Sequence, residues 1–140
     1  MKHILALVMT IALAGSAFAQ AVGRFTFQGK EEMFWVDDGR RLAISKTCRK
    51  LPRIHGKPAD YDCEAYRILS TVNLAELNTA VAEGANAGAV LCQTVLKQTV
   101  VIGLDFNQNE NSFCKFADGS YLDCGTLFYY ARLNRDKKQH

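Results

Sequence analysis

The segment VGRFTFQGKEEMFWVDDGRRLAISKT, residues 22–47, decides the fold. Its first part, residues 22–28, places two phenylalanines on one face and polar side chains on the other, with the two-residue period of a β-strand. Asp37-Asp38-Gly39 is a hairpin signal, and strands are predicted over 33–36 and 42–47 on either side of it. An antiparallel meander therefore begins the folded part of the chain.

Strand and helix signals alternate in the middle of the chain. Apolar side chains favour a strand over residues 66–72, and Asn73 is predicted to cap a helix that Gly84 ends. Asn86 is predicted to cap a second, short helix over residues 87–95.

A hairpin and a helix are predicted for the C-terminal third. Strands over 99–104 and 112–117 are joined by a polar turn, residues 107–111. Helical spacing of apolar side chains favours a helix over 123–133, and a polar tail, 135–140, follows it. The order of elements predicts an α+β fold with a small antiparallel sheet and one to three short helices.

The first 19 residues have the three parts of a secretory signal peptide. These are a basic start at Lys2, an apolar run over 4–14 and the cleavage pattern Ala17-Phe18-Ala19. The run is too short to span a bilayer, which takes about 20 residues, so an integral membrane protein is not expected. Residues 20–140 are then predicted to be one exported domain, periplasmic or secreted.

Five cysteines lie in this exported part, where disulfides persist: Cys48, Cys63, Cys92, Cys114 and Cys124. Sequence proximity favours a bridge between Cys48 and Cys63, and closing a loop of that length contributes about 3 kcal/mol by chain entropy. The second bridge would come from the other three cysteines, whose pairing stays open. One thiol is left over, and it could join two chains covalently.

A basic segment is the sharpest functional signal. From Gly39 to Pro58 the chain carries seven basic side chains and no acidic one, and Pro52, Gly56 and Pro58 predict a loop within 48–63. The candidate binding residues are Arg49, Lys50, Arg53 and Lys57. Such a loop could hold an anionic partner in the cell envelope, namely a lipid head group, a glycan phosphate or an acidic protein face. A formal net charge of +3 and the compartment argue against nucleic acid.

Few residues suit enzymatic chemistry. A Ser or Cys nucleophile needs a nearby base, and the exported part offers only His55 and the last residue, His140. His55 with Asp60, Asp62 and Cys63 follows no zinc spacing.

Acidic and amide side chains give two further alternatives. Asp105-x-Asn107-x-Asn109-x-Asn111 has the alternating oxygens of a calcium loop but lacks its glycine and glutamate, so a polar turn is favoured. Carboxylate pairs for glycoside cleavage are candidates by count only: Glu31-Glu32, Asp37-Asp38, and Asp60 with Asp62. We expect no catalytic residue, no metal site and no cofactor.

Two motifs occur in residues 86–133: NAGAVLC over 86–92 and CKFADGS over 114–120. They resemble the Asn-Pro-Ala-x-x-x-Cys opening and the Cys-x-Phe-x-Asp-Gly-Ser signature of a family of small bacterial envelope proteins named hemolysins. Ala87 stands where that family has proline, and its last cysteine has no equivalent near Asn134. The resemblance implies an envelope location and would explain the odd thiol.

The second motif needs no chemistry to account for it. Cys114 and Phe116 fall on one strand face, where one can bridge and the other can pack. Gly119 permits the positive φ of a turn.

The predicted function is an exported, non-enzymatic binding or structural protein of the bacterial envelope. Its partner is an unidentified protein or an anionic lipid or glycan. The alternatives are a small secreted hydrolase or enzyme inhibitor, which would use His55 or a buried carboxylate, and a membrane-active factor, which only the family name suggests.

Overall fold

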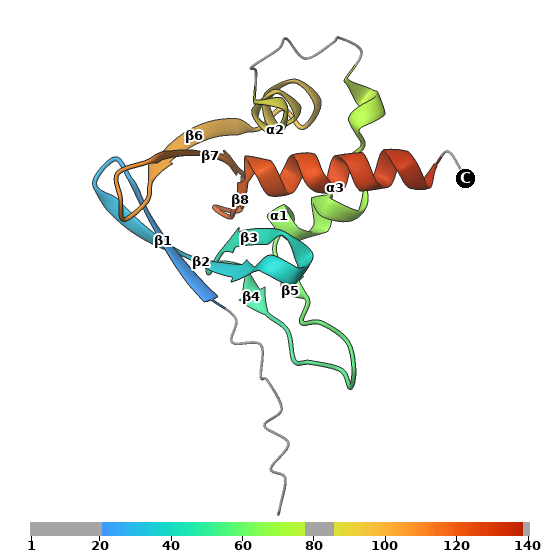
Figure 1. Cartoon of the computed structure of the whole chain (residues 1–140), viewed down its shortest axis with the longest axis horizontal. Coiled ribbons are helices and arrows are strands. Elements are labelled where there is room, and N and C mark those ends of the chain that lie inside the picture. Colours follow the sequence, from blue (N-terminus) through green and yellow to red (C-terminus); the bar gives the residue numbers. More distant parts are fainter. Residues whose placement is uncertain (1–20, 78–85, 139–140) are drawn as a thin grey trace, which may run out of the picture.

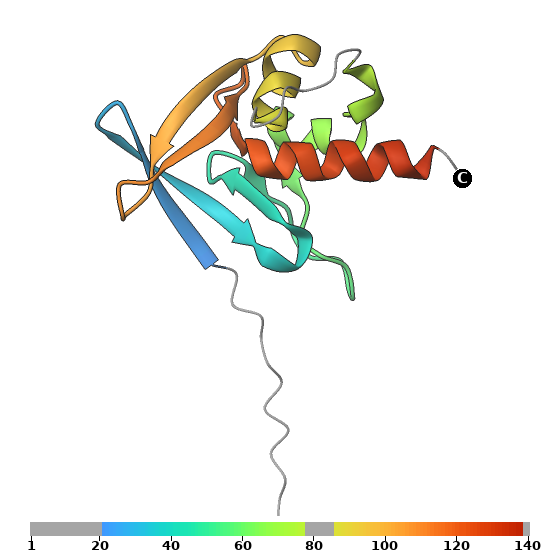
Figure 2. The same ribbon diagram turned by 45° about the horizontal axis from the view of Figure 1, so that its top comes forward.

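The computed structural model describes residues 21–77 and 86–138. They form an antiparallel six-stranded barrel whose helices gather beside it (Figure 1 and Figure 2). Around the barrel the strand order is β1-β2-β3-β8-β7-β6. These strands are β1 (Ala21–Phe27), β2 (Lys30–Asp37), β3 (Leu42–Ser45), β6 (Thr99–Leu104), β7 (Glu110–Lys115) and β8 (Tyr121–Asp123). The predicted α+β class with an antiparallel sheet is confirmed, and the closure of that sheet is an additional finding.

Narrow contacts close the barrel. The β1–β2 and β6–β7 hairpins pair along their whole lengths, whereas β1 meets β6 only at Thr26 and Leu104, and β3 meets β8 only at Ile44 and Leu122. The barrel is therefore two three-stranded antiparallel units, β1-β2-β3 and β6-β7-β8, joined edge to edge through single residue pairs.

An aromatic cluster occupies one face of the sheet. Phe27, Phe34 and Phe113 are buried there, and the rings of Phe34 and Phe113 lie 4.9 Å apart. Gly103 makes room for them, because a Cβ at this position would lie 2.7 Å from the ring of Phe27. The alternation predicted for residues 22–28 is the one that brings Phe27 to this face.

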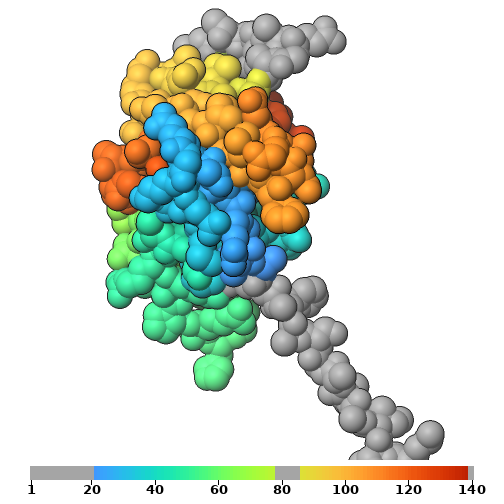
Figure 3. All heavy atoms as spheres, turned by 90° about the vertical axis from the view of Figure 1, so that its left-hand side faces the viewer, coloured from blue at the N-terminus to red at the C-terminus, as the bar shows by residue number. Residues whose placement is uncertain are grey.

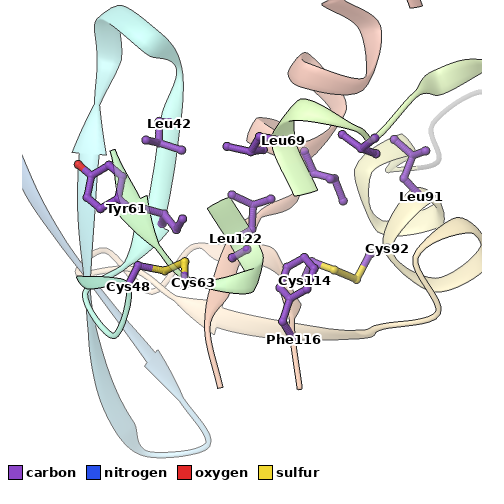
Figure 4. Close-up of a cluster of buried hydrophobic side chains, with 14 of the residues drawn as sticks. Leu42, Cys48, Tyr61, Cys63, Leu69, Leu91, Cys92, Cys114, Phe116 and Leu122 are labelled. Atoms are coloured by element: carbon purple, nitrogen blue, oxygen red, sulfur yellow. A yellow bond between two sulfur atoms is a disulfide. The ribbon is translucent and has the colours of Figure 1, made fainter. Parts of the chain in front are cut away.

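The larger hydrophobic core lies between the other sheet face and the helices (Figure 4). Ile44 and Leu122 contribute from the strands, and Leu127 and Ala131 from helix α3 (Cys124–Lys137). All four are at most 2% exposed. The helix predicted over 123–133 is confirmed, and it continues four residues further into the polar tail.

One predicted strand is wrong. Residues 66–72 form part of helix α1 (Glu64–Arg67) and a 3-10 turn over Ile68–Ser70. The cause lies far away in the chain, because the backbone N–H groups of Glu64 and Ala65 donate to Asp118 and Ser120 side chains. These contacts cap the start of the helix, and local apolar spacing cannot reveal them.

Two predicted helix caps are confirmed. The Asn73 side chain accepts from the N–H of Ala75, but the helix predicted after it is wrong over the described residues, where a 3-10 turn, Leu74–Glu76, leads into extended backbone at Leu77. The Asn86 side chain accepts from the N–H of Ala89 at the start of helix α2 (Ala87–Val90), which continues as a π-helical turn, Leu91–Val95. The predicted signal peptide, the helix end at Gly84 and His140 lie outside the described residues.

Two disulfides tie the core together. Cys48–Cys63 and Cys92–Cys114 join Cα atoms 5.0 and 5.7 Å apart, and all four residues belong to the hydrophobic core. The predicted first bridge is confirmed, and the pairing that the sequence left open is Cys92 with Cys114. Each closes a loop worth about 3 kcal/mol by chain entropy.

Candidate functional site

The basic loop, residues 51–60, projects from the molecule, and paired strands and a disulfide close its base. Strands β4 (Arg49–Lys50) and β5 (Tyr61–Asp62) pair to form its stem, and the Cys48–Cys63 disulfide closes the chain just outside them. Residues 52–58 are all exposed. They extend away from the body of the molecule in Figure 1 and Figure 3.

A turn shapes the apex of the basic loop. The N–H of Lys57 donates to the carbonyl oxygen of Ile54 over 3.0 Å, and Gly56 adopts a φ of 73°, which favours glycine. Ile54 is 70% exposed although it is large and apolar. The apex therefore presents an isoleucine between Arg53 and Lys57.

The predicted binding residues do not form one patch. Arg49 pairs with Asp62 over 3.2 Å, and Arg67 pairs with the other oxygen of the same carboxylate over 3.1 Å. The Lys50 ammonium lies 5.1 Å from the centre of the Trp35 ring, on the stem. Of the four candidates, only Arg53 and Lys57 lie on the loop itself, and both line one groove.

The ring of Trp35 lies beside two lysines of the basic segment, a role that the sequence did not reveal. The ammonium groups of Lys46 and Lys50 lie 4.4 and 5.1 Å from its ring centre, within the range of cation–π attraction. Among the described residues its buried indole N–H has no hydrogen-bond partner. Two members of the basic segment are therefore directed at an aromatic ring of β2 beside the stem.

Arg40 holds the basic loop against the turn between β2 and β3. Its Nε donates to Asp37 over 2.7 Å, and its guanidinium donates to the carbonyl oxygen of Ala59 over 2.8 Å. Burial alone would raise the pKa of Asp37, but the hydrogen bonds and charge of Arg40 outweigh it and lower that pKa. Arg40 therefore joins the basic loop to the turn, and no local sequence pattern could have indicated this role.

The loop and the turn enclose a groove of about 1040 Å³. Arg53, His55 and Lys57 line its loop side, together with apolar surface from Ile54 and Pro58. Asp37 and Asp38 line the turn side, where Arg40 neutralises the first of them. The groove can bind a ligand that has an anionic group, on the loop side, and an apolar group next to it.

The structure gives His55 no nucleophile in this groove. None of the described residues that line it is a serine, threonine or cysteine. Asp60 accepts a hydrogen bond from the Tyr66 hydroxyl over 2.7 Å, and Asp62 is shared by two arginines. Within residues 21–77 and 86–138, no group of three or more His, Cys, Asp or Glu side chains is placed to hold a metal ion.

Hydrogen bonds explain the calcium-like repeat. Asp105 Oδ1 accepts from the N–H groups of Asn107 and Asn109, and its Oδ2 accepts from the side-chain amide of Asn109. The hydrogen bonds from Asn109 lower the pKa of Asp105. The favoured interpretation, a polar turn, is the one that the structure supports.

The CKFADGS motif has a structural role. Gly119 has a φ of 83°, and the Asp118 and Ser120 side chains accept from the first N–H groups of helix α1. Cys114 and Phe116 both belong to the core cluster that packs against the helices. The motif therefore closes a turn and caps a helix more than 50 residues earlier in the chain.

The unpaired thiol is sequestered. Cys124 is 1% exposed, and burial, aided by the charge of Asp123, raises its pKa to about 12. A thiol with such a pKa is inert, since the thiolate is the reactive form. A covalent dimer through Cys124 would require the start of α3 to open.

Two other hollows lie on the barrel. One, of about 390 Å³, lies beside the start of α3 and includes Arg41 and Asp123, and burial raises the pKa of Asp123. The other, of about 1040 Å³, includes Lys30, Lys115 and Tyr121. Neither contains a residue that the sequence predicts to bind.

The described residues contain no helix long and apolar enough to cross a membrane. The two disulfides fit an extracellular or periplasmic protein. No protein-family model, no curated protein and no solved structure matches the chain.

Proposed function

We propose that this is an exported, non-enzymatic binding protein of the bacterial envelope, which engages an anionic partner through the basic loop. One observation carries the proposal: Arg53, His55 and Lys57 line the same groove on a loop whose base is closed by paired strands and a disulfide. Preorganised cations cost less entropy to order when a ligand binds. The predicted signal peptide and the two disulfides support a periplasmic or secreted location.

The resemblance of residues 86–133 to the hemolysin-named family is part of the same proposal. Asp118 and Ser120 cap α1 and Cys92–Cys114 bridges the core, so the residues that carry the resemblance have structural roles that suit an exported domain.

Charge reversal on the loop tests the proposal. The variant Arg53→Glu/Lys57→Glu should lose most of its co-sedimentation with bacterial envelope fragments, because two cations at the groove become anions. The control is Arg24→Glu/Lys137→Glu, which changes the net charge equally at exposed positions outside the groove. Equal sedimentation of the loop variant, its control and the native protein would refute the proposal.

A further inference from the structure

The apex of the basic loop combines charge with an apolar tip. The basic loop carries two basic side chains, Arg53 and Lys57, and one acidic one, Asp60, which is engaged by the Tyr66 hydroxyl at the foot of the loop. Ile54 stands at the tip with 70% of its surface exposed. An apolar tip flanked by cations can bind an anionic membrane surface, because apolar burial and electrostatic attraction add.

The shape of the loop indicates what kind of partner fits. Its seven exposed residues, 52–58, form a narrow convex projection, as Figure 1 and Figure 3 show. A stable protein interface buries about 800 Å² on each partner and needs a broad complementary surface. A bilayer surface is soft and flat, so it can accept a narrow projection whose tip enters the head-group layer.

The stem lets the loop approach a surface without deforming. The Cys48–Cys63 disulfide and the hydrogen bond from Leu51 N–H to the Asp60 carbonyl oxygen close its base. Arg40 holds it from the side through the carbonyl oxygen of Ala59. The loop therefore meets a surface already ordered, and little entropy is lost on contact.

We propose that the basic loop docks on anionic lipid bilayers, with Ile54 inserted among the head groups and Arg53 and Lys57 against the lipid phosphates. This inference rests on the proposed function and names its partner. Each basic side chain near an anionic bilayer strengthens binding by roughly fivefold. Insertion of the isoleucine side chain adds about tenfold. The contact is weak, reversible and sensitive to salt.

Vesicle sedimentation of the full exported chain with its disulfides formed tests the inference. The native protein should sediment with phosphatidylcholine vesicles that contain phosphatidylglycerol, should stay in solution with phosphatidylcholine alone, and should be released by high salt. Ile54→Ser should reduce the binding constant about tenfold. Ile102→Ser is the matched control, since Ile102 is 48% exposed on β6, and it should bind like the native protein.

Three results would overturn the inference: equal binding to both vesicles, unchanged binding of Ile54→Ser, or retention by envelope proteins from which lipid has been extracted without retention by phosphatidylglycerol vesicles. The last result would leave the proposed function intact and assign its partner to protein. If the native protein bound neither envelope fragments nor phosphatidylglycerol vesicles, the proposed function and the lipid inference would both be refuted.

Discussion

Replacing Gly88 with alanine should destabilise the domain, because helix α2 meets the start of α3 at this residue. A Cβ atom built at Gly88 would lie 1.8 Å from the carbonyl oxygen of Cys124 and 2.6 Å from its carbonyl carbon. Both are backbone atoms, which cannot rotate away as the end of a side chain can. The two helices would have to separate, and the Cys92–Cys114 bridge next to them limits that movement.

The expected magnitude follows from two opposing effects. Overpacking of a well-filled core costs about 3 kcal/mol at the upper end of its usual range. Alanine gains about 1 kcal/mol over glycine in helix propensity. We expect Gly88→Ala to lower the free energy of unfolding by about 2 kcal/mol, which for a domain of this size lowers Tm by about 8 °C.

Thermal unfolding followed by circular dichroism, with the disulfides intact, measures this effect. Gly39→Ala is the control, because its Cβ would meet only the Asp37 side chain at 3.5 Å, an ordinary contact. The control should unfold near the native Tm. A Gly88→Ala variant as stable as the native protein, or more stable, would show that the approach of the two helices is not close, and the reasoning would fail.

Three further predictions concern titratable groups. Cys124 should resist alkylation in the native state and react only after unfolding, when intact-mass measurement without reductant should count one modified thiol. Burial alone would raise the pKa of Asp118, but hydrogen bonds from Ser120 and from the N–H of Glu64 lower it. The ionised Asp118 therefore stabilises the fold above the ordinary pKa of 3.8, and this stabilisation is lost as pH falls through the lower folded-state pKa. The loss should be absent when the unfolding of Asp118→Asn is followed against pH. Asp123 caps α3, and burial raises its pKa. At neutral pH Asp123→Asn, which can still accept the capping hydrogen bond, should keep the native Tm within about 2 °C, whereas Asp123→Ala should lower the free energy of unfolding in urea by about 1 kcal/mol. Equal losses in both variants would contradict the capping role.

Local patterns predicted the elements that depend on local physics. The alternation around Phe25 and Phe27 identified β1, and side-chain caps at Asn73 and Asn86 were recognised from residue type alone. The strand predicted over 66–72 failed because distant caps from the CKFADGS motif hold this segment as a helix. Barrel closure depends on the meeting of Thr26 and Leu104, which no local period encodes.

The candidate site shows the same division. Composition identified the basic segment and sequence proximity identified its disulfide, but the use of each cation depended on partners supplied by other elements. Asp62 engages Arg49 on the stem, Trp35 receives Lys50, and only Arg53 and Lys57 are left to line the groove. Ile54 had a sequence signal, a large apolar residue between the basic residues Arg53 and Lys57, that could have marked the apex.

Trp35 is the single tryptophan of the chain, and its position beside the stem of the basic loop gives the protein an intrinsic optical reporter. Indole emission responds to nearby charges, so a ligand that draws the ammonium group of Lys46 or Lys50 away from the ring should shift the fluorescence emission without any attached dye. Ligand binding beside the stem and unfolding of the whole domain can therefore both be followed by fluorescence in one unlabelled sample.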